Sequence, residues 1–352
     1  MKFAPFEYRR PSSLGEVDAC LEGEDTRLLA GGQSLLPLMA FRLARPRVLV
    51  DLAAVGELRG IRIEQPGSAI AAGGARAASL QPGTSGSPGM PAPSYLVVGA
   101  MTTHAELRAS ALAAANLPLL RHVAAEIGHP AIRHLGTIGG SLAHADPAAE
   151  WPATCIALGA EVELHAAGGS RRLPVERLLL GPYQTVLAEG EVLCAVRFPL
   201  ATGMSGALAE VARRPGDFAL AGAVCTAWRS QQGALRNSDA PVAGEARSGG
   251  SLASGSVTLF GVCGRPVRVE LPPDLLADPR TSELSALLDL HLDGALADHQ
   301  ADATFRRHLA AVVAGRAIRA AAAAPGRAPG DGRAPGDGRA PGGGGTPVGR
   351  RP

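Results

Sequence analysis

Two short glycine-rich segments carry the clearest chemical signal in this sequence. The first, Ala30 to Leu38, reads A-G-G-Q-S-L-L-P-L and follows an apolar pair, Leu28-Leu29. Adjacent glycines let backbone N–H groups converge on an anion, and Gln33 and Ser34 add side-chain donors. A pyrophosphate is the usual ligand of such a loop. Taken alone, the pattern also fits an ordinary strand-to-helix turn.

The second segment, Gly136 to Ser141, reads G-T-I-G-G-S and again pairs glycines with hydroxyl groups. Two such loops in one chain predict a grip on opposite sides of one diphosphate and its attached ring system. The chain contains no G-x-G-x-x-G, so a bound dinucleotide would be held by an architecture other than the Rossmann fold.

The residues around both segments resemble a known family. Ala30 to Leu52 looks like the first FAD loop of the medium subunit of molybdenum hydroxylases, and His129 to Ala153 looks like the second. This family includes the medium chain of aerobic carbon monoxide dehydrogenase and the FAD subunit of xanthine dehydrogenase-type enzymes. Three further stretches fit it, namely Gly99 to Leu107, Glu210 to Ala219, and F-R-R-H-L at Phe305. The resemblance runs from Met1 to about Ala324, apart from two low-complexity insertions, and both loops occur in the family's order and distance.

The resemblance implies that FAD is the cofactor and that the two loops hold its diphosphate. The residues implied are Ala30, Gly31, Gly32, Gln33 and Ser34 in the first loop, and Thr137, Ile138, Gly139, Gly140 and Ser141 in the second. It also implies that Glu150 sits near the flavin or its ribityl chain. Aspartate is usual at that position, and His129 and His134 replace a commoner Asp and Asn. No side chain is needed as a catalytic group if the flavin carries the redox chemistry.

The resemblance also implies two partner chains. A large subunit would hold the molybdopterin centre, and a small subunit would carry two [2Fe–2S] clusters. Electrons would reach FAD on this chain and pass to NAD, a quinone or oxygen. The five cysteines form no C-x-x-C pair, in agreement with clusters that lie on another chain. The alternative is a flavin-free structural scaffold subunit of the same type of complex, against which the intact glycines argue.

Two other groups of residues need a chemical interpretation. His129, His134 and His144 lie close in sequence to Asp146, but their spacing matches no helical ligand pair, so we expect no metal site. Arg213-Arg214 precede Pro215-Gly216-Asp217, and the pattern fits either an anion clamp or a turn with two solvated arginines.

Composition excludes several classes of function. The formal net charge is +2, and the last 28 residues contribute +3, so the rest of the chain is close to neutral at about −1. Only 3% of residues are aromatic. Nucleic acid is therefore not an expected partner. Lys2 is the only lysine, which rules out a P-loop. The first ten residues lack the apolar region of a signal peptide and no apolar run is long enough to span a membrane. We therefore expect a cytoplasmic protein.

Hydrophobic patterning predicts short strands mixed irregularly with helices, which indicates an α+β fold. Strands are expected at 47–52, 94–100, 160–166, 192–198, 219–228 and 257–262, and helices at 117–128, 146–158 and 298–324. The family resemblance implies a two-lobed FAD-binding fold of the vanillyl-alcohol-oxidase (PCMH) type and a smaller α+β C-terminal domain. The expected domains are 1–200, with a low-complexity insertion at 81–94, and 201–324, with an insertion at 231–256. Residues 325–352 read as a disordered Gly/Pro/Arg-rich tail.

Overall fold

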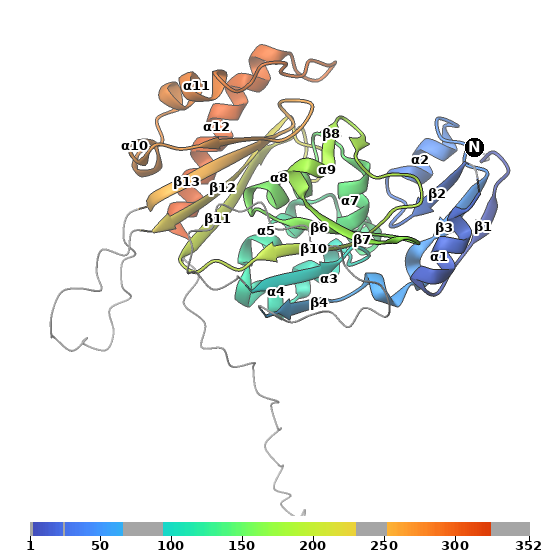
Figure 1. The fold of residues 1–352 in the computed structure, drawn as a ribbon. Helices are drawn as coiled ribbons and strands as arrows, with labels where there is room; N and C mark the ends of the chain where they lie inside the picture. Colours follow the sequence, from blue (N-terminus) through green and yellow to red (C-terminus); the bar gives the residue numbers. More distant parts are fainter. Residues whose placement is uncertain (1–2, 24, 66–93, 230–251, 325–352) are drawn as a thin grey trace, which may run out of the picture.

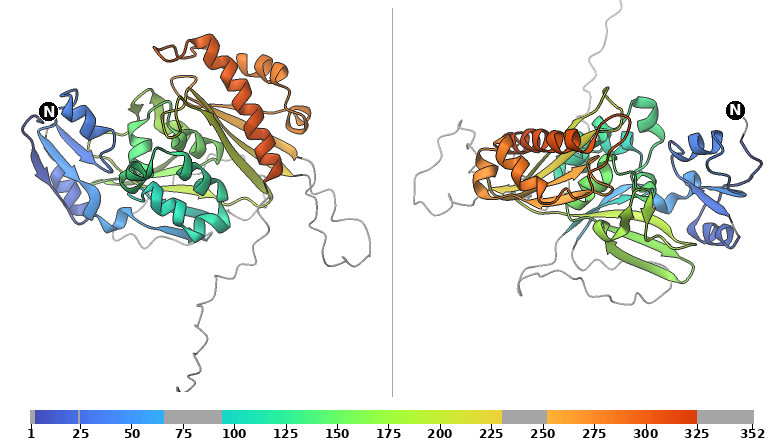
Figure 2. Two further views of the ribbon diagram at one scale, coloured as in Figure 1. Left: turned by 180° about the vertical axis from the view of Figure 1, so that it is seen from behind. Right: turned by 90° about the horizontal axis from the view of Figure 1, so that it is seen from above.

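A computed structural model of the chain describes residues 3–23, 25–65, 94–229 and 252–324. Three β-sheets follow one another from one end of the molecule to the other, each with its own helices (Figures 1 and 2). The α+β fold class is therefore confirmed.

The first unit is a small parallel sheet in the order β1-β3-β2. Its strands are β1 (Glu7–Arg9), β2 (Thr26–Leu29) and β3 (Val48–Asp51), and its helices are α1 (Leu14–Leu21) and α2 (Leu35–Ala40). Because β2 and β3 are parallel, the chain must cross over between them, and α2 lies in that crossover. The first glycine segment follows β2 directly and leads into α2.

The second unit is an antiparallel five-stranded sheet in the order β4-β5-β10-β6-β7. Its strands are β4 (Ile61–Glu64), β5 (Tyr95–Gly99), β6 (Glu161–Ala166), β7 (Gly169–Pro174) and β10 (Val192–Pro199). Its helices are α3 (His104–Ala109), α4 (Ala111–Asn116), α5 (Pro118–Glu126), α6 (Pro130–Leu135), α7 (Ile138–His144), α8 (Glu150–Ala157) and α9 (Val175–Leu178). A two-stranded ribbon of β8 (Leu179–Gly181) and β9 (Gln184–Thr185) follows α9.

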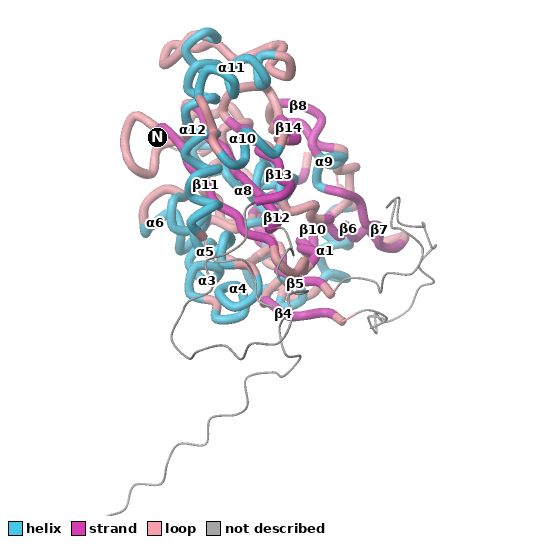
Figure 3. Tube along the Cα trace, turned by 90° about the vertical axis from the view of Figure 1, so that its left-hand side faces the viewer, coloured by secondary structure: helices cyan, strands magenta, loops and turns pink. Residues whose placement is uncertain are grey.

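The third unit is an antiparallel sheet in the order β11-β12-β13-β14. Its strands are β11 (Met204–Val211), β12 (Ala221–Arg229), β13 (Leu252–Phe260) and β14 (Val267–Glu270), and its helices are α10 (Pro273–Ala277), α11 (Thr281–Asp289) and α12 (Ala303–Ala323). Figure 3 shows α10, α11 and α12 together on this part of the molecule. Helix α12 packs along β11 and β12.

The side chains of β12 alternate between two cores. Ala221, Ala223, Cys225 and Ala227 pack with α12, whereas Val224 packs into the same core as Trp151 of α8. This period of two is the signature of a strand that is buried on both faces. The third unit therefore shares a hydrophobic core with the second, and helix α8 lies between them.

Most predicted elements are present, with shifted ends. Pro118 occupies the first turn of α5, as predicted. The helix predicted from Asp146 begins only at Glu150, because the Asp146 carboxylate accepts the Ala148 N–H at 2.8 Å and caps a turn instead. The helix predicted from Asp298 begins at Ala303, where Asp302 is the N-cap and accepts from the Phe305 N–H at 2.7 Å.

The second predicted insertion extends too far. Residues 252–256 belong to β13 and pair with β12, although their Gly/Ser-rich composition predicted a loop. Pairing in the sheet overrides that local preference. The rest of this insertion, most of the insertion at 81–94 and the whole tail lie outside the described residues. The domain boundary near residue 200 falls between β10 and β11 and stays a prediction.

Candidate functional site

The first glycine segment forms the turn between β2 and α2. Gly32 adopts φ +71°, and Ser34 is in the right-handed helical region. The N–H groups of Gly31, Gly32, Gln33 and Ser34 have no hydrogen-bond acceptor among the described residues. The Gln33 amide donates back to the carbonyl oxygen of Gly31 at 2.9 Å, which fixes the loop. Successive free amides in such a turn form an anion-binding nest.

The two glycine segments lie against each other, although about 100 residues separate them in the sequence. A β-carbon added at Gly31 would collide with the backbone carbonyl of Leu135 and lie 2.8 Å from Cα of Gly136. A β-carbon at Gly140 would lie 3.2 Å from Cβ of Ala30. The structure therefore brings together the two loops that the sequence predicted to cooperate.

We had expected the second segment to be a loop. In the structure it forms the first turn of helix α7 instead, and most of its amides are engaged. The Ile138 and Gly139 N–H groups donate to the carbonyl oxygens of Thr102 and Ala100, at 3.2 and 2.9 Å. The Gly140 N–H donates to Oγ1 of Thr137, the N-cap, at 3.1 Å. These three amides are therefore engaged within the protein. What α7 offers at its start is close backbone approach and the Ser141 hydroxyl, for which no partner occurs among the described residues.

These features fit a diphosphate. An anion needs hydrogen-bond donors, and the four unpaired amides and the Ser34 hydroxyl can supply them. A side chain at Gly31 would fill the contact between the two segments, so the glycines keep the backbones close enough to share one ligand.

Comparison with known proteins identifies the family of the chain. A family profile described as the FAD binding domain in molybdopterin dehydrogenase matches residues 4–80 and 91–201. The medium chain of carbon monoxide dehydrogenase from Hydrogenophaga pseudoflava is 40% identical over 220 residues, which are 62% of this chain and 67% of that protein. The chain belongs to this family of FAD-binding domains.

Two further relatives extend the comparison. Subunit alpha of the 6-hydroxypseudooxynicotine dehydrogenase complex from Paenarthrobacter nicotinovorans is 37% identical over 72% of this chain and 76% of that one. The crystal structure of a cyanide-inactivated Cu,Mo-CO dehydrogenase contains a chain with a TM-score of 0.74 and 32% identity, over 92% of this chain and 99% of that one. This chain is thus an FAD-binding medium subunit of the molybdenum hydroxylase type, a component of oxidoreductase complexes.

In this medium subunit, Glu150 is a buried acid and does not line the contact between the two segments. It lies at the first position of α8 and is only 7% exposed. Burial raises the pKa of Glu150 to about 8, and the negative charge of Glu210 on β11 adds to the effect. Burial likewise raises the pKa of Glu210 to about 7. Glu150 therefore connects the FAD-binding part to the third sheet, a position that its sequence motif alone does not reveal.

The sequence analysis missed Tyr183. This residue is 59% exposed and has φ +58°, a left-handed conformation that is uncommon for a bulky residue. Its backbone N–H donates to the carbonyl oxygen of Ala145 at 2.9 Å, and its hydroxyl donates to Asp146 at 3.2 Å. The Tyr183 ring lies 5.1 Å from the ring of His144, at the end of α7. Its turn sequence, G-P-Y-Q, was the available signal.

The three histidines that we considered as metal ligands have different surroundings. His129 precedes α6, His134 is exposed on α6, and His144 contacts Tyr183. The described part of the chain holds no group of three or more His, Cys, Asp or Glu residues arranged to bind a metal.

Arg213 and Arg214 lie in the exposed turn between β11 and β12. Gly216 of this turn has φ +84° and packs against the carbonyl oxygen of Gly128, at the entry to α6. Neither arginine forms an ion pair with a described residue. The turn therefore lies near the start of α6, and both interpretations of the arginines stay open.

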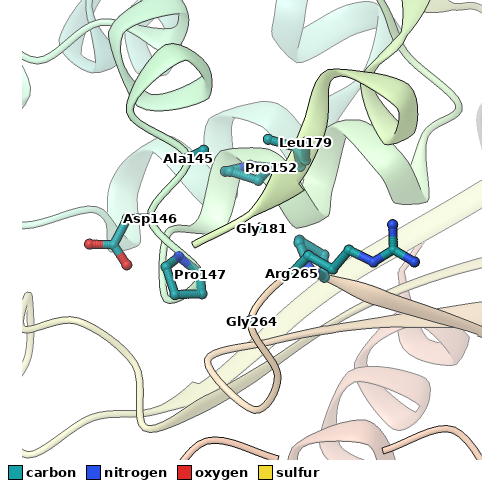
Figure 4. A pocket seen from close by; sticks show the side chains of 9 residues that line it. Ala145, Asp146, Pro147, Pro152, Leu179, Gly181, Gly264 and Arg265 are labelled. Atoms are coloured by element: carbon teal, nitrogen blue, oxygen red, sulfur yellow. The ribbon is translucent and has the colours of Figure 1, made fainter. Parts of the chain in front are cut away.

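A separate cleft lies where the second and third units meet. Its lining, shown in Figure 4, includes Ala145, Asp146 and Pro147 after α7 and Gly264 and Arg265 before β14. Beyond it, a cavity of about 490 Å³ is lined by Leu180, Arg265, Arg268 and His291 among others. None of the residues predicted to bind the diphosphate lines this cavity.

No helix within the described ranges is long and apolar enough to cross a membrane.

Proposed function

We propose that this chain is the FAD-carrying electron-transfer subunit of a molybdenum hydroxylase. It accepts electrons from [2Fe–2S] clusters on a small partner chain and passes them to NAD, a quinone or oxygen. A large partner chain holds the molybdopterin centre and oxidises the substrate. The relatives described above are medium chains or complex subunits, which supports a division of labour among several chains.

The observation that carries the proposal is the contact between the two glycine segments. The free amides of Gly31, Gly32, Gln33 and Ser34 bind the diphosphate, with Ala30 at the start of the loop. The start of α7, from Thr137 to Ser141, closes the other side through its close backbone and the Ser141 hydroxyl. Bound FAD would supply the electron exchange. The protein's part is to hold and orient it.

Two further residues, Glu150 at the start of α8 and Tyr183 against the end of α7, bring chemistry of their own to the FAD-binding part. Glu150 is half or more protonated near neutral pH, because its pKa is raised to about 8, so it can donate a hydrogen bond as well as accept one. Tyr183 and His144 present an aromatic surface at the end of α7. This aromatic pair lies at the opposite end of α7 from the second glycine segment.

The experiment is release of the cofactor from the purified full-length chain. The chain should show flavin absorption, and acid precipitation should release yellow FAD into the supernatant, with about one FAD per chain. A colourless chain that also fails to bind added FAD would support the flavin-free scaffold. Flavin that stays with the precipitate would show covalent attachment, for which we identify no residue.

A further inference from the structure

Helix α3 is joined to the second glycine segment at its first residue. The backbone N–H of His104 donates to the carbonyl oxygen of Gly136 at 3.0 Å. The preceding residue, Thr103, forms an isolated β-bridge with Thr137. Thr103 also forms a capping box with Glu106, which fixes the start of α3. Gly136, the first residue of the second segment, is thus anchored to the capped start of α3.

The imidazole of His104 is a buried acceptor for an indole. His104 is 4% exposed and Trp151 of α8 is fully buried. The Trp151 Nε1–H donates to Nδ1 of His104 at 3.1 Å. Because an indole nitrogen can only donate, Nδ1 must be the unprotonated nitrogen and the hydrogen of the neutral ring is on Nε2.

Burial keeps this imidazole neutral. It lowers the pKa of His104 to about 4, and the charge of Arg133 on α6 acts in the same direction. Arg133 itself is held by the carbonyl oxygens of Ala125, Ile127 and Gly128 at the end of α5. The hydrogen bond from Trp151 therefore persists across the neutral pH range.

The opposite edge of the imidazole lies against the second segment. A β-carbon added at Gly136 would be 2.8 Å from Nε2 of His104. The Gly136 backbone also meets Gly31, whose added β-carbon would be 2.8 Å from Cα of Gly136. A continuous line of contacts thus runs from Trp151 through His104 and Gly136 to Gly31 in the first loop.

We propose that His104 and Trp151 are positioning residues for FAD: together they hold Gly136 against Gly31 and so set the spacing of the two segments. This inference rests on the proposed function. An ordinary core pair would contribute to stability only. A positioning pair also determines how tightly, and in what orientation, the folded protein binds FAD.

The test uses substitutions in the full-length chain that separate the hydrogen bond from the packing. His104→Leu keeps most of the volume but removes the acceptor, Trp151→Phe removes the donor, and His104→Asn restores an acceptor oxygen near the place of Nδ1. His122→Leu, at an exposed position on α5, and Trp228→Phe, on β12, are the matched controls. For each variant the dissociation constant for FAD, the visible circular dichroism of bound flavin, and the unfolding midpoint of the FAD-free chain are measured.

We expect His104→Leu and Trp151→Phe each to weaken FAD binding about tenfold, because without the hydrogen bond the residue at position 104 no longer holds Gly136 at its set distance from Gly31. The flavin dichroism should change in both. His104→Asn should bind FAD within about threefold of the unsubstituted chain. The double variant His104→Leu/Trp151→Phe should lose little more FAD affinity than either single variant, because the two groups act as one unit. Both controls should bind FAD normally.

Unchanged affinity and dichroism in Trp151→Phe, with only a lower unfolding midpoint, would overturn the proposal. Failure of His104→Asn to bind better than His104→Leu would also overturn it. If His104→Leu does not fold, the milder Trp151→Phe decides the outcome. An unsubstituted chain that binds no FAD would instead refute the proposed function, so the two failures are distinguishable.

Discussion

Gly31 and Leu135 are in direct backbone contact, and this contact joins the two glycine segments. Any side chain at Gly31 would collide with the carbonyl of Leu135. The first loop is therefore not an isolated turn after β2. Its shape depends on the end of α6 and on the residue that precedes α7. Both lie in the second unit, whereas the loop itself lies in the first.

Gly31→Ala should weaken FAD binding while most of the fold remains. The added methyl group must push the segments apart, and overpacking of this kind costs about 1 to 3 kcal/mol, which corresponds to a roughly 5- to 150-fold loss of affinity if it falls on the site. The measurement is FAD content of the purified chain together with titration of the FAD-free chain. Gly15→Ala in α1 is the matched control, because nothing lies within 4 Å of a β-carbon there. Full FAD content in Gly31→Ala would place the cofactor elsewhere.

The sequence predicted which residues would meet but not how they would be held. Alternating and periodic apolar residues were enough to locate β3, β5, β6 and α5 within a few residues. Gly139 and Gly140 concealed α7, because glycine is a poor helix former and the helix depends on amide bonds to Ala100 and Thr102. Such long-range partners leave no local pattern.

The same limit applies to the residues behind the site. His104 and Trp151 are 47 positions apart, and neither lies in a spacing that signals contact. Glu150 was recognisable only through its family motif, and its burial beside Glu210 depends on how α8 packs against the third sheet. Local chemistry was predictable, whereas contacts between units required the fold.

Glu150→Gln should remove a pH dependence of stability. The pKa of Glu150 rises from 4.5 to about 8 in the folded state, mainly through burial, so the folded chain binds more protons than the unfolded chain between these values. The free energy of unfolding must therefore fall as pH rises from 4.5 to about 8. At pH 8 the uncharged glutamine should stabilise the chain by up to about 4 kcal/mol, and at pH 5 by less than about 1 kcal/mol.

Urea unfolding across this pH range measures the effect, and Glu189→Gln at an exposed position is its control. The same slope with pH in Glu150→Gln and in the unsubstituted chain would show that Glu150 is already charged, and therefore solvated, in the folded protein.

Breaking the buried ion pair between Arg197 and Glu64 should destabilise the second sheet. Arg197 on β10 is 3% exposed and donates to both carboxylate oxygens of Glu64 on β4, at 2.6 and 2.9 Å. Its guanidinium also lies 4.6 Å from the centre of the Tyr95 ring. Glu64→Ala leaves this charge buried and unpaired, at a cost of about 3 kcal/mol.

The double variant Arg197→Met/Glu64→Leu should be more stable than Glu64→Ala alone, because no unpaired charge remains. Denaturant unfolding of the three proteins gives the comparison. Equal stability of Glu64→Ala and the unsubstituted chain would mean that water, not Glu64, solvates Arg197.

The isolated full-length chain should exchange electrons through its flavin but should not oxidise an organic substrate. The proposed division of labour assigns substrate oxidation to the large partner chain that would hold the molybdopterin centre. Anaerobic mixing with carbon monoxide, a purine or an N-heterocycle should leave the flavin absorption unchanged, whereas dithionite should bleach it. Adding the reduced [2Fe–2S] subunit should also bleach it. Rapid bleaching by an organic substrate with no partner chain present would show that this subunit oxidises substrate itself, and the proposed division of labour would be wrong.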